Sequence, residues 1–471
     1  MNKYDGNFQY YTKKTQNFAP LLKMFAFEIV IIQGLLINNT VITFFAFILL
    51  FLFYKNSFLS IILVPPLFST VLLTSGDHTI NIMLAAFFIF FFILYIIRNN
   101  IITDKRLALL FLYLVITIVG LFNAVVFGKF LSFINWDYES ILSENLLSSI
   151  PKIVFAFGMF LFIQNEGYRF LKKNLILATK LIPISLIIVS IYFITVGYEI
   201  SNWENLGIRL VFQGSDPNDF SAMLIALGAF SYYLVLKSSS KLWTFIGIVS
   251  TILVVYSVLL TASRTGILTL VFTTILTLIL FSKRNFKRST FVILFLIFSA
   301  LVLFYSNLID FNFIYERFFG KYITDISSLT AGRTDWWKAA FEAFKQKPIF
   351  GYGGSQKASQ WINFNMYGKA YVMHNLFIEI LIQYGVVGLT VFLLLIIRLL
   401  ADLKNLLKLN KKQATDTTYL IIPFISLASI LFAGLALSLQ WSALLWYLIP
   451  LCFSIGSFVE EYVRESRAYL L

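Results

Sequence analysis

Four residues combine a chemically useful side chain with an unusual position in this sequence. Arg209, Arg264 and Arg333 lie between apolar runs, and His374 stands at the start of another apolar run. Guanidinium groups bind phosphate oxygens through paired hydrogen bonds, and an imidazole that is neutral near pH 7 can accept a proton. These residue types are suited to binding an anion and to accepting a proton next to it.

Arg264 occupies the tight turn Ala262-Ser263-Arg264-Thr265-Gly266 between two apolar runs. The turn places it at the boundary between an apolar layer and water, at the start of the next helix. An anion there would be bound by the guanidinium group, by the hydroxyls of Ser263 and Thr265 and by N–H groups of the helix end. The pattern predicts a phosphate site, and the alternative is an arginine that snorkels to the membrane surface.

Arg209 lies in a short loop that leads into Asp216-Pro217-Asn218-Asp219. Asp216 and Pro217 are expected to be the N-cap and first residue of the following helix, and Asp219 falls near its third position, where a negative charge suits the helix dipole. The two carboxylates could instead bind a divalent metal ion or an acceptor sugar. Two acids without a nearby histidine or third acid are a weak metal signal.

The longest segment between apolar runs, residues 308–373, contains a predicted amphipathic helix. Its proposed face recurs at spacings of three and four and consists of Arg333, Trp336, Trp337, Ala340, Phe341 and Phe344. Such helices commonly lie in the membrane interface, but Arg333 on the aromatic face would point towards a pocket near the membrane. The tryptophans of the outer loops, Trp203 among them, either anchor the interface or stack on sugars. Pro348 and the glycines after it predict a helix stop and a flexible turn.

His374 is followed by Asn375 and, deeper in the same apolar run, by Glu379. A helix N-terminus disfavours the imidazolium form and keeps His374 neutral, whereas a nearby anionic substrate would favour the protonated form. At about 1.5 Å per residue, Glu379 lies roughly 7 to 8 Å further along the helix. An acid at that depth is costly unless it faces a cavity.

The composition shows what must position these residues. Of 471 residues, 59% are hydrophobic and only 13% are charged, with a mean hydropathy of +0.83. Soluble domains carry roughly 25% charged residues, so most of this apolar surface must face lipid. The single cysteine, Cys452, excludes an intramolecular disulfide and a thiol metal cluster. The sequence predicts an all-α, polytopic membrane helix bundle of about 12–14 spans.

The predicted spans cover residues 24–39, 40–54, 58–74, 79–97, 106–127, 151–163, 176–196, 217–236, 243–261, 264–282, 289–307, 374–397, 418–438 and 440–459. The corresponding divisions are a cytoplasmic N-terminal segment (1–23), N-terminal helices (24–196), central helices with the outer arginine loops (197–307), a large extracytoplasmic loop (308–373), C-terminal helices (374–459) and a cytoplasmic tail (460–471). The first pair of spans could be a re-entrant hairpin, because both are short.

The basic residues predict the orientation of these spans. With both termini in the cytoplasm, most of the 37 Lys and Arg residues fall on the cytoplasmic side. The short outer loops then hold only Lys129, Lys152, Arg209 and Arg264. This is the bias of inner-membrane proteins, so the net charge of +14 sets orientation and does not indicate nucleic-acid binding. The candidate chemistry lies on the extracytoplasmic side.

In this order, the motifs resemble the O-antigen polymerase and ligase superfamily (Wzy and WaaL type) over about residues 200–400. The matching features are Asp216-Pro217-Asn218-Asp219 after an outer-loop arginine, Ser263-Arg264-Thr265-Gly266, Gly332-Arg333 with Trp336 or Trp337 and Ala340, Pro348 with Gly351 and Gly353, and His374-Asn375 with Glu379 and Tyr384-Gly385-Val386-Val387-Gly388.

The resemblance implies a GT-C-type glycosyltransferase that uses glycans linked to undecaprenyl pyrophosphate at the outer leaflet, without metal or other cofactor and with inversion. It implies that Arg209, Arg264 and Arg333 bind the pyrophosphate and that His374 orients or deprotonates the acceptor hydroxyl. The implied substrate-binding set is completed by Ser263, Thr265, Asp216, Asn218, Asp219, Asn375, Glu379 and Trp336. Implied partners are the lipid-linked oligosaccharide, membrane lipids, and a chain-length regulator and flippase of the same pathway.

Within that superfamily, a surface-polysaccharide polymerase is the first hypothesis and an O-antigen ligase acting on lipid A-core is the second, with an oligosaccharyltransferase related to the latter. A transporter of lipid-linked oligosaccharides is the alternative from another class. Transporters place charge near the membrane midplane, often on helices related by internal repeats. Here the candidate residues gather at the outer boundary, which favours an enzyme.

Overall fold

The computed structural model describes residues 104–128, 149–195, 198–202, 208–212, 216–281, 315, 330, 332–412, 417–440 and 442–468. All of them belong to one of the two compact units of the chain, Ile62–Leu471. The predicted N-terminal segment 1–23, the predicted spans 24–39, 40–54, 58–74, 79–97 and 289–307, and Trp203 lie outside the described residues.

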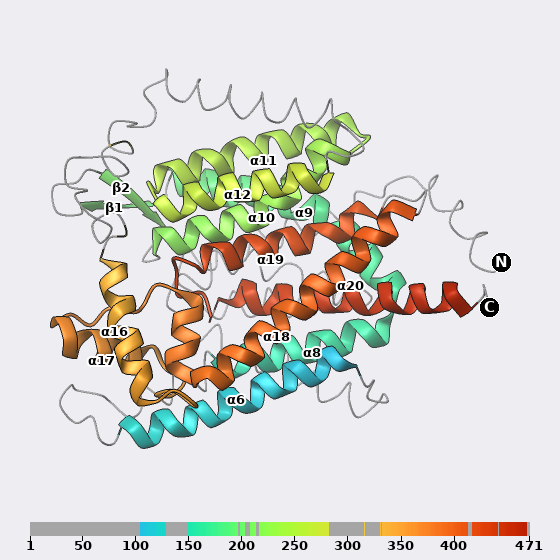
Figure 1. Ribbon diagram of the computed structural model, residues 1–471. Coiled ribbons are helices and arrows are strands. Elements are labelled where there is room, and N and C mark those ends of the chain that lie inside the picture. Colours follow the sequence, from blue (N-terminus) through green and yellow to red (C-terminus); the bar gives the residue numbers. More distant parts are fainter. Residues whose placement is uncertain are drawn as a thin grey trace, which may run out of the picture. The chain divides into compact units, whose positions relative to one another are not determined.

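The described part of the chain is an assembly of helices with one small hairpin (Figure 1). Its elements are α6 (Lys105–Gly128), α8 (Ile150–Glu166), α9 (Tyr168–Thr195), β1 (Tyr198–Asn202), β2 (Ile208–Phe212), α10 (Pro217–Lys237), α11 (Lys241–Leu260), α12 (Arg264–Phe281), α16 (Arg333–Gln346), α17 (Gln356–Tyr367), α18 (Leu376–Lys412), the 3-10 helix η4 (Thr418–Ile421), α19 (Ile422–Ala433) and α20 (Ala443–Ala468). Among these, seven helices are long and apolar enough to cross a membrane. The all-α polytopic fold class is confirmed.

The helices and the predicted spans agree in position but differ in length. α9 begins at Tyr168, eight residues before the predicted start at 176, and α18 continues to Lys412, well beyond 397. The hydropathy pattern ends where charged side chains begin, whereas the backbone hydrogen bonds of a helix continue into the charged interface. The sequence did not predict the antiparallel hairpin of β1 and β2. In this hairpin Ser201 pairs with Arg209.

α18 is interrupted at Gly385, which has φ 66° and ψ −166° inside an otherwise helical run. An interrupted helix leaves N–H and C=O groups without their usual partners, which is costly inside a membrane. The segment after α16 supplies new partners on the far side of the break. Val386 N donates to Pro348 O at 2.8 Å, and Val387 N donates to Ile349 O at 3.3 Å.

The same segment also satisfies the carbonyl groups before the break. Tyr352 N donates to Ile382 O at 2.8 Å, and Gly353 N donates to Gln383 O at 2.9 Å. Residues 348–353, the predicted flexible glycine turn, therefore form a backbone insert in α18. This insert joins α16 and α17 to the helix bundle, and Figure 1 shows both lying beside the first turns of α18.

The insert requires glycine because the two backbones touch. A Cβ atom on Gly385 would lie 2.1 Å from Ile349 O, and one on Gly351 would lie 2.4 Å from Ile382 O. Both glycines also have positive φ values, of 66° and 68°. L-residues with side chains rarely adopt that conformation, so steric and conformational costs add.

Gly385→Ala is expected to destabilise the protein by about 2 kcal/mol or more, because the new methyl group meets backbone that cannot turn away. The measurement is the temperature at which half of the detergent-solubilised protein loses its monodisperse elution. Gly228→Ala in α10 is the control, since its nearest neighbour would be Val254 Cγ1 at 3.6 Å. An unchanged midpoint for Gly385→Ala would contradict the close packing of the insert.

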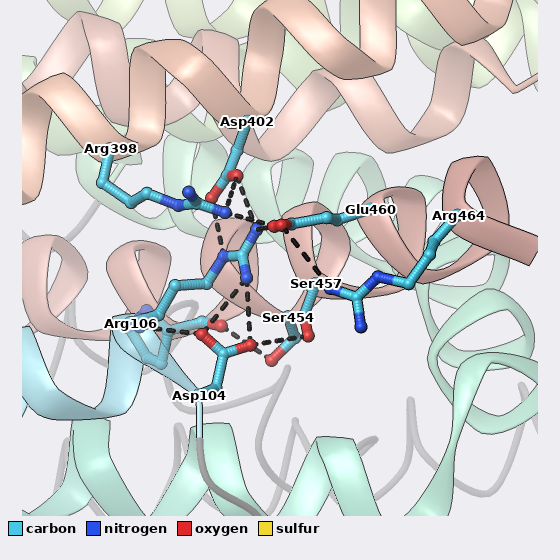
Figure 2. A network of polar contacts seen from close by, with 9 residues as sticks. Asp104, Arg106, Arg398, Asp402, Ser454, Ser457, Glu460 and Arg464 are labelled. Carbon is cyan, nitrogen blue, oxygen red and sulfur yellow. Dashed lines mark hydrogen bonds and ion pairs between the residues drawn. The ribbon is translucent and has the colours of Figure 1, made fainter.

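At the other end of α18, a buried ion-pair network joins three helices (Figure 2). Arg106 of α6 donates from Nη2 to Asp402 Oδ1 at 2.7 Å and from Nε to Asp402 Oδ2 at 2.9 Å. It also pairs with Asp104 at 2.9 Å and with Glu460 of α20 at 2.9 Å. Arg398 pairs with both Asp402 and Glu460. Arg106 and Asp402 are 2% and 0% exposed, so their charges depend on each other.

Replacing Arg106 with alanine is expected to cost about 3–5 kcal/mol of stability, because it leaves the Asp402 carboxylate buried with fewer partners. The same elution assay would measure this loss. Lys345→Ala serves as the comparison because its pair with Glu342 is exposed on both sides, and removing it should change the stability by less than about 1 kcal/mol. Equal losses of stability in the two variants would show that the buried network stabilises the protein no more than an exposed ion pair does.

Candidate active site

The start of α10 is held by its own side chains in the way the sequence predicts. Asp216 is the N-cap and accepts a hydrogen bond at Oδ1 from Asn218 N at 2.7 Å. Pro217 follows as the first helical residue, and Asp219 lies in the first turn. The predicted capping role of Asp216 is confirmed. Capping uses one carboxylate oxygen and leaves this residue exposed to solvent.

Asn218 connects the start of α10 to the turn between α11 and α12. Ser263 Oγ donates to Asn218 Oδ1 at 2.7 Å and accepts from Gly266 N at 2.9 Å, so Ser263 caps α12. The turn is tight, as predicted, because α11 ends at Leu260 and α12 begins at Arg264. A Cβ atom on Gly266 would lie 2.7 Å from Ser221 Cβ of α10. The two helix starts are therefore packed against each other.

Arg333, the first residue of α16, reaches this pair of helix starts. Its Nη1 donates to Thr265 Oγ1 at 3.4 Å. Burial lowers the pKa of Arg333, nearby Asp216 and Asp219 raise it, and Arg264 lowers it. The guanidinium remains charged, because arginine side chains stay protonated in proteins. Two arginines and two carboxylates from α10, α12 and α16 thus act on one another electrostatically. A half-buried cation of this kind binds an incoming anion strongly.

His374 lies in the same group, but it precedes α18 and does not open it as predicted. Its φ is 47°, and the helix begins at Leu376. The centre of its ring lies 5.4 Å from that of Trp336. Burial lowers the pKa of His374 to about 4, with a smaller lowering by the charge of Arg333 and an opposing effect of Asp216. The ring is therefore neutral at pH 7, as expected, but burial is the main cause.

Asn375 and Glu379 are engaged with the protein itself. Asn375 Oδ1 accepts from Phe377 N and Ile378 N, both at 3.0 Å, and caps α18, while its Nδ2 donates to Leu435 O at 2.8 Å. The Glu379 side chain is fully buried and hydrogen-bonded to four partners. The substrate-binding roles predicted for both residues stay predictions.

The aromatic face predicted for α16 is correct only in part. Ala340 is buried, and Trp336 and Phe344 pack against the same core, but Phe341 is 51% exposed. The buried face is centred on the alanines instead, because α16 packs closely against α17 and α18. Trp337 Nε1 donates to Met373 O at 2.9 Å and so ties α16 to the residue before His374.

Other residues near the site carried no signal that we read in the sequence. Tyr371 lies against Trp336 with ring centres 4.9 Å apart and ring planes tilted by 36°, and Ser359 and Ser438 donate hydrogen bonds to Glu379. No local sequence pattern distinguishes these serines and this tyrosine from others in the chain, because their contacts form only when the chain folds. Arg209 lies in β2, which contacts α10, but its side chain is not among the described ones. Where the structure is described, no group of three or more His, Cys, Asp or Glu could hold a metal ion.

Fold and site together define a multi-pass membrane protein with a buried, charged site where several helices begin. Residues 249–393 match the family model described as O-antigen ligase (Wzy_C). The matched segment includes Arg264, Arg333 and His374, whereas Arg209 and Asp216 precede it. The match confirms the resemblance to the O-antigen polymerase and ligase superfamily and supports a Wzy/WaaL-type enzyme of O-antigen processing. No curated protein matches the chain significantly.

The lowered pKa of His374 predicts a pH dependence of stability. The unfolded chain binds a proton at this residue below about pH 6.5, and the folded protein does so only near pH 4, so stability falls as the pH drops between these values. We expect a loss of about 2–3 kcal/mol across this window. Thermal midpoints at pH 7, 5.5 and 4.5 test it, and His374→Gln should show a smaller fall. Parallel curves for both proteins would contradict a buried neutral ring.

Proposed function

We propose that this protein transfers a glycan from a polyprenyl pyrophosphate carrier to a hydroxyl acceptor at the extracytoplasmic face of the inner membrane. The observation that carries the proposal is the grouping of Arg264, Arg333 and neutral His374 from three separate segments. Arg333 reaches Thr265, the neighbour of Arg264 on α12, and His374 lies against Trp336 of α16. Two cations next to a proton acceptor suit a reaction in which a pyrophosphate departs and a hydroxyl attacks. The family match supports the same class of enzyme.

In the proposed reaction, the acceptor oxygen attacks the anomeric carbon while the bond from that carbon to the phosphate oxygen breaks. The electron pair of the broken bond stays with the pyrophosphate, where Arg264 and Arg333 stabilise the charge. The hydroxyl proton passes to His374, which is neutral and can accept it. A single displacement inverts the anomeric configuration. Arg209 would add a third cation from the hairpin beside α10.

The first candidate for the acceptor is a second lipid-linked repeat unit, which makes the protein a surface-polysaccharide polymerase. The second candidate is lipid A-core, and the description of the matching family as O-antigen ligase favours it. The donor chemistry is the same in both. A chain-length regulator and a flippase of the same pathway are proposed partners of the polymerase.

The proposed orientation has both termini in the cytoplasm. In the structure, the starts of α10, α12 and α18 gather near the site, whereas the start of α6 and the far part of α18 meet in the Arg106 network. This arrangement agrees with the predicted alternation of the spans, and the basic residues assign the side of the Arg106 network to the cytoplasm. The site then faces the compartment in which lipid-linked glycans are polymerised or transferred.

Arg264→Ala and His374→Ala are each expected to lower product formation about 100-fold or more, because they remove stabilisation of the leaving group and the proton acceptor. The assay uses purified protein with lipid-linked repeat units and separates products by size. Lys338→Ala on the exposed side of α16 should keep wild-type activity. Membrane levels of each variant are measured in parallel.

The acceptor is decided in the same assay. Polymer from repeat units alone supports the polymerase, whereas products that appear only when lipid A-core is added support the ligase. Wild-type product length with both Arg264→Ala and His374→Ala would overturn the proposed site. Movement of the lipid-linked glycan across a vesicle membrane without new glycosidic bonds would show a transporter instead.

A further inference from the structure

The carboxylate of Glu379 is a buried meeting point of four chain segments. It lies in the first turn of α18 and is 0% exposed. Its Oε1 accepts from Met373 N at 2.8 Å and from Ser438 Oγ at 3.0 Å. Its Oε2 accepts from Ser359 Oγ of α17 and from Gln383 Nε2 at 3.1 Å. The partners come from α17, from the segment before α18, from α18 itself and from the segment after α19.

These contacts leave little capacity for a substrate. Each carboxylate oxygen has one partner that can only donate, Met373 N for Oε1 and the Gln383 amide nitrogen for Oε2, and one hydroxyl partner. Four donors fill the positions at which an ionised carboxylate accepts hydrogen bonds. A side chain that is buried and fully paired in this way is suited to holding its neighbours in place.

One of those neighbours is the residue before His374. His374 has φ 47°, in the left-handed region that residues with side chains rarely adopt, so the surrounding contacts must hold it there. Met373 is fixed by Glu379 at its N–H and by Trp337 at its carbonyl. On the other side, Asn375 is fixed by its hydrogen bond to Leu435 O. His374 is thus held between two anchored residues.

We propose that Glu379 is a positioning residue that holds His374 in its buried, proton-accepting position. This inference rests on the proposed function for the role of His374. The charged groups that act on His374 are Arg333 from α16 and Asp216 from the start of α10. Without the Glu379 anchor, the 373–375 segment would relax and the imidazole would reach water beside these groups.

Comparing Glu379→Ala with Glu379→Gln separates positioning from proton transfer. Glutamine keeps the shape, and its Oε1 can still accept from Met373 N. Its new NH2 group would meet Gln383, whose Oε1 has no hydrogen-bond partner in the described structure and can accept after the Gln383 amide turns over. We expect Glu379→Gln to keep activity within about threefold of wild type, and Glu379→Ala to lose at least about tenfold in kcat with little change in KM.

The pH profile gives a readout that a loss of folded protein would not change. Once released, His374 should return towards its ordinary pKa of about 6.5. The kcat/KM of Glu379→Ala should therefore gain an acid limb near pH 6.5 that the wild type lacks, because the protonated ring cannot accept a proton. Equal losses in the alanine and glutamine variants would overturn the proposal, since they would indicate that the carboxylate itself takes part in the reaction.

Chemical modification tests the same idea without any enzyme assay. The chain has two histidines, so in a His78→Gln background the absorbance of the carbethoxyhistidine formed by diethyl pyrocarbonate reports on His374 alone. All proteins are full-length and in detergent. We expect His374 to react at least about tenfold faster in the Glu379→Ala variant than in the wild type or in the Glu379→Gln variant. Thr273→Val is the matched control, because it removes a buried hydrogen bond to Ser429 at 2.7 Å far from the site.

The two hypotheses fail in different ways. Suppose that the wild type forms no glycosidic bonds but that His374 is modified faster in Glu379→Ala than in the wild type. The proposed function is then wrong, whereas the positioning role of Glu379 is supported. If the enzyme is active and His374 reacts equally fast in the wild type and in Glu379→Ala, the positioning role is overturned. Should Glu379→Ala not accumulate, Ser359→Ala replaces it. It removes one of the four donors and should raise the modification rate in the same direction by a smaller factor.

Discussion

The need to pair backbone groups inside a membrane is the constraint on which the rest of this structure depends. α18 is broken at Gly385, and residues 348–353 replace the hydrogen bonds that the break removes. Because the insert and α18 contact each other through their backbones, the distance between α16 and α18 can vary only within narrow limits. Arg333 at the start of α16 and His374 before α18 are thereby brought to the same site. The glycine turn that looked flexible in sequence is one of the most constrained parts of the described chain.

Charge is used differently at the two ends of α18. Around the site, burial and the charge of Arg264 lower the pKa of Arg333, while Asp216 and Asp219 raise it. At the other end, Arg106 is surrounded by carboxylates and fully paired (Figure 2). A paired network holds helices together, whereas a half-buried cation is left with affinity for an anion that arrives from outside. The contrast supports a binding role at the first end and a structural role at the second.

The site also shows how a neutral histidine is obtained near Arg333. Burial is the largest cause of the low pKa of His374, and the charge of Arg333 adds to it. Burial in turn requires the residues on both sides of His374 to be fixed, which Glu379 and Asn375 achieve through hydrogen bonds. In the interpretation that we propose, Glu379 therefore positions His374 through Met373, without contacting the imidazole itself. The match over residues 249–393 includes Arg333, His374 and Glu379, whereas Leu435 and Ser438 follow it.

The sequence alone determined the features that depend on composition and on near neighbours. Hydropathy predicted the described spans, Asp216 and Pro217 predicted the start of α10, and the turn around Arg264 is as tight as its length required. Only the tertiary structure decided which residues far apart in the sequence contact one another. The break at Gly385, the four partners of Glu379 and the exposure of Phe341 depend on segments far away in the chain. Local patterns cannot specify such contacts, because a glycine or an acid has the same local preferences whatever the fold later places beside it.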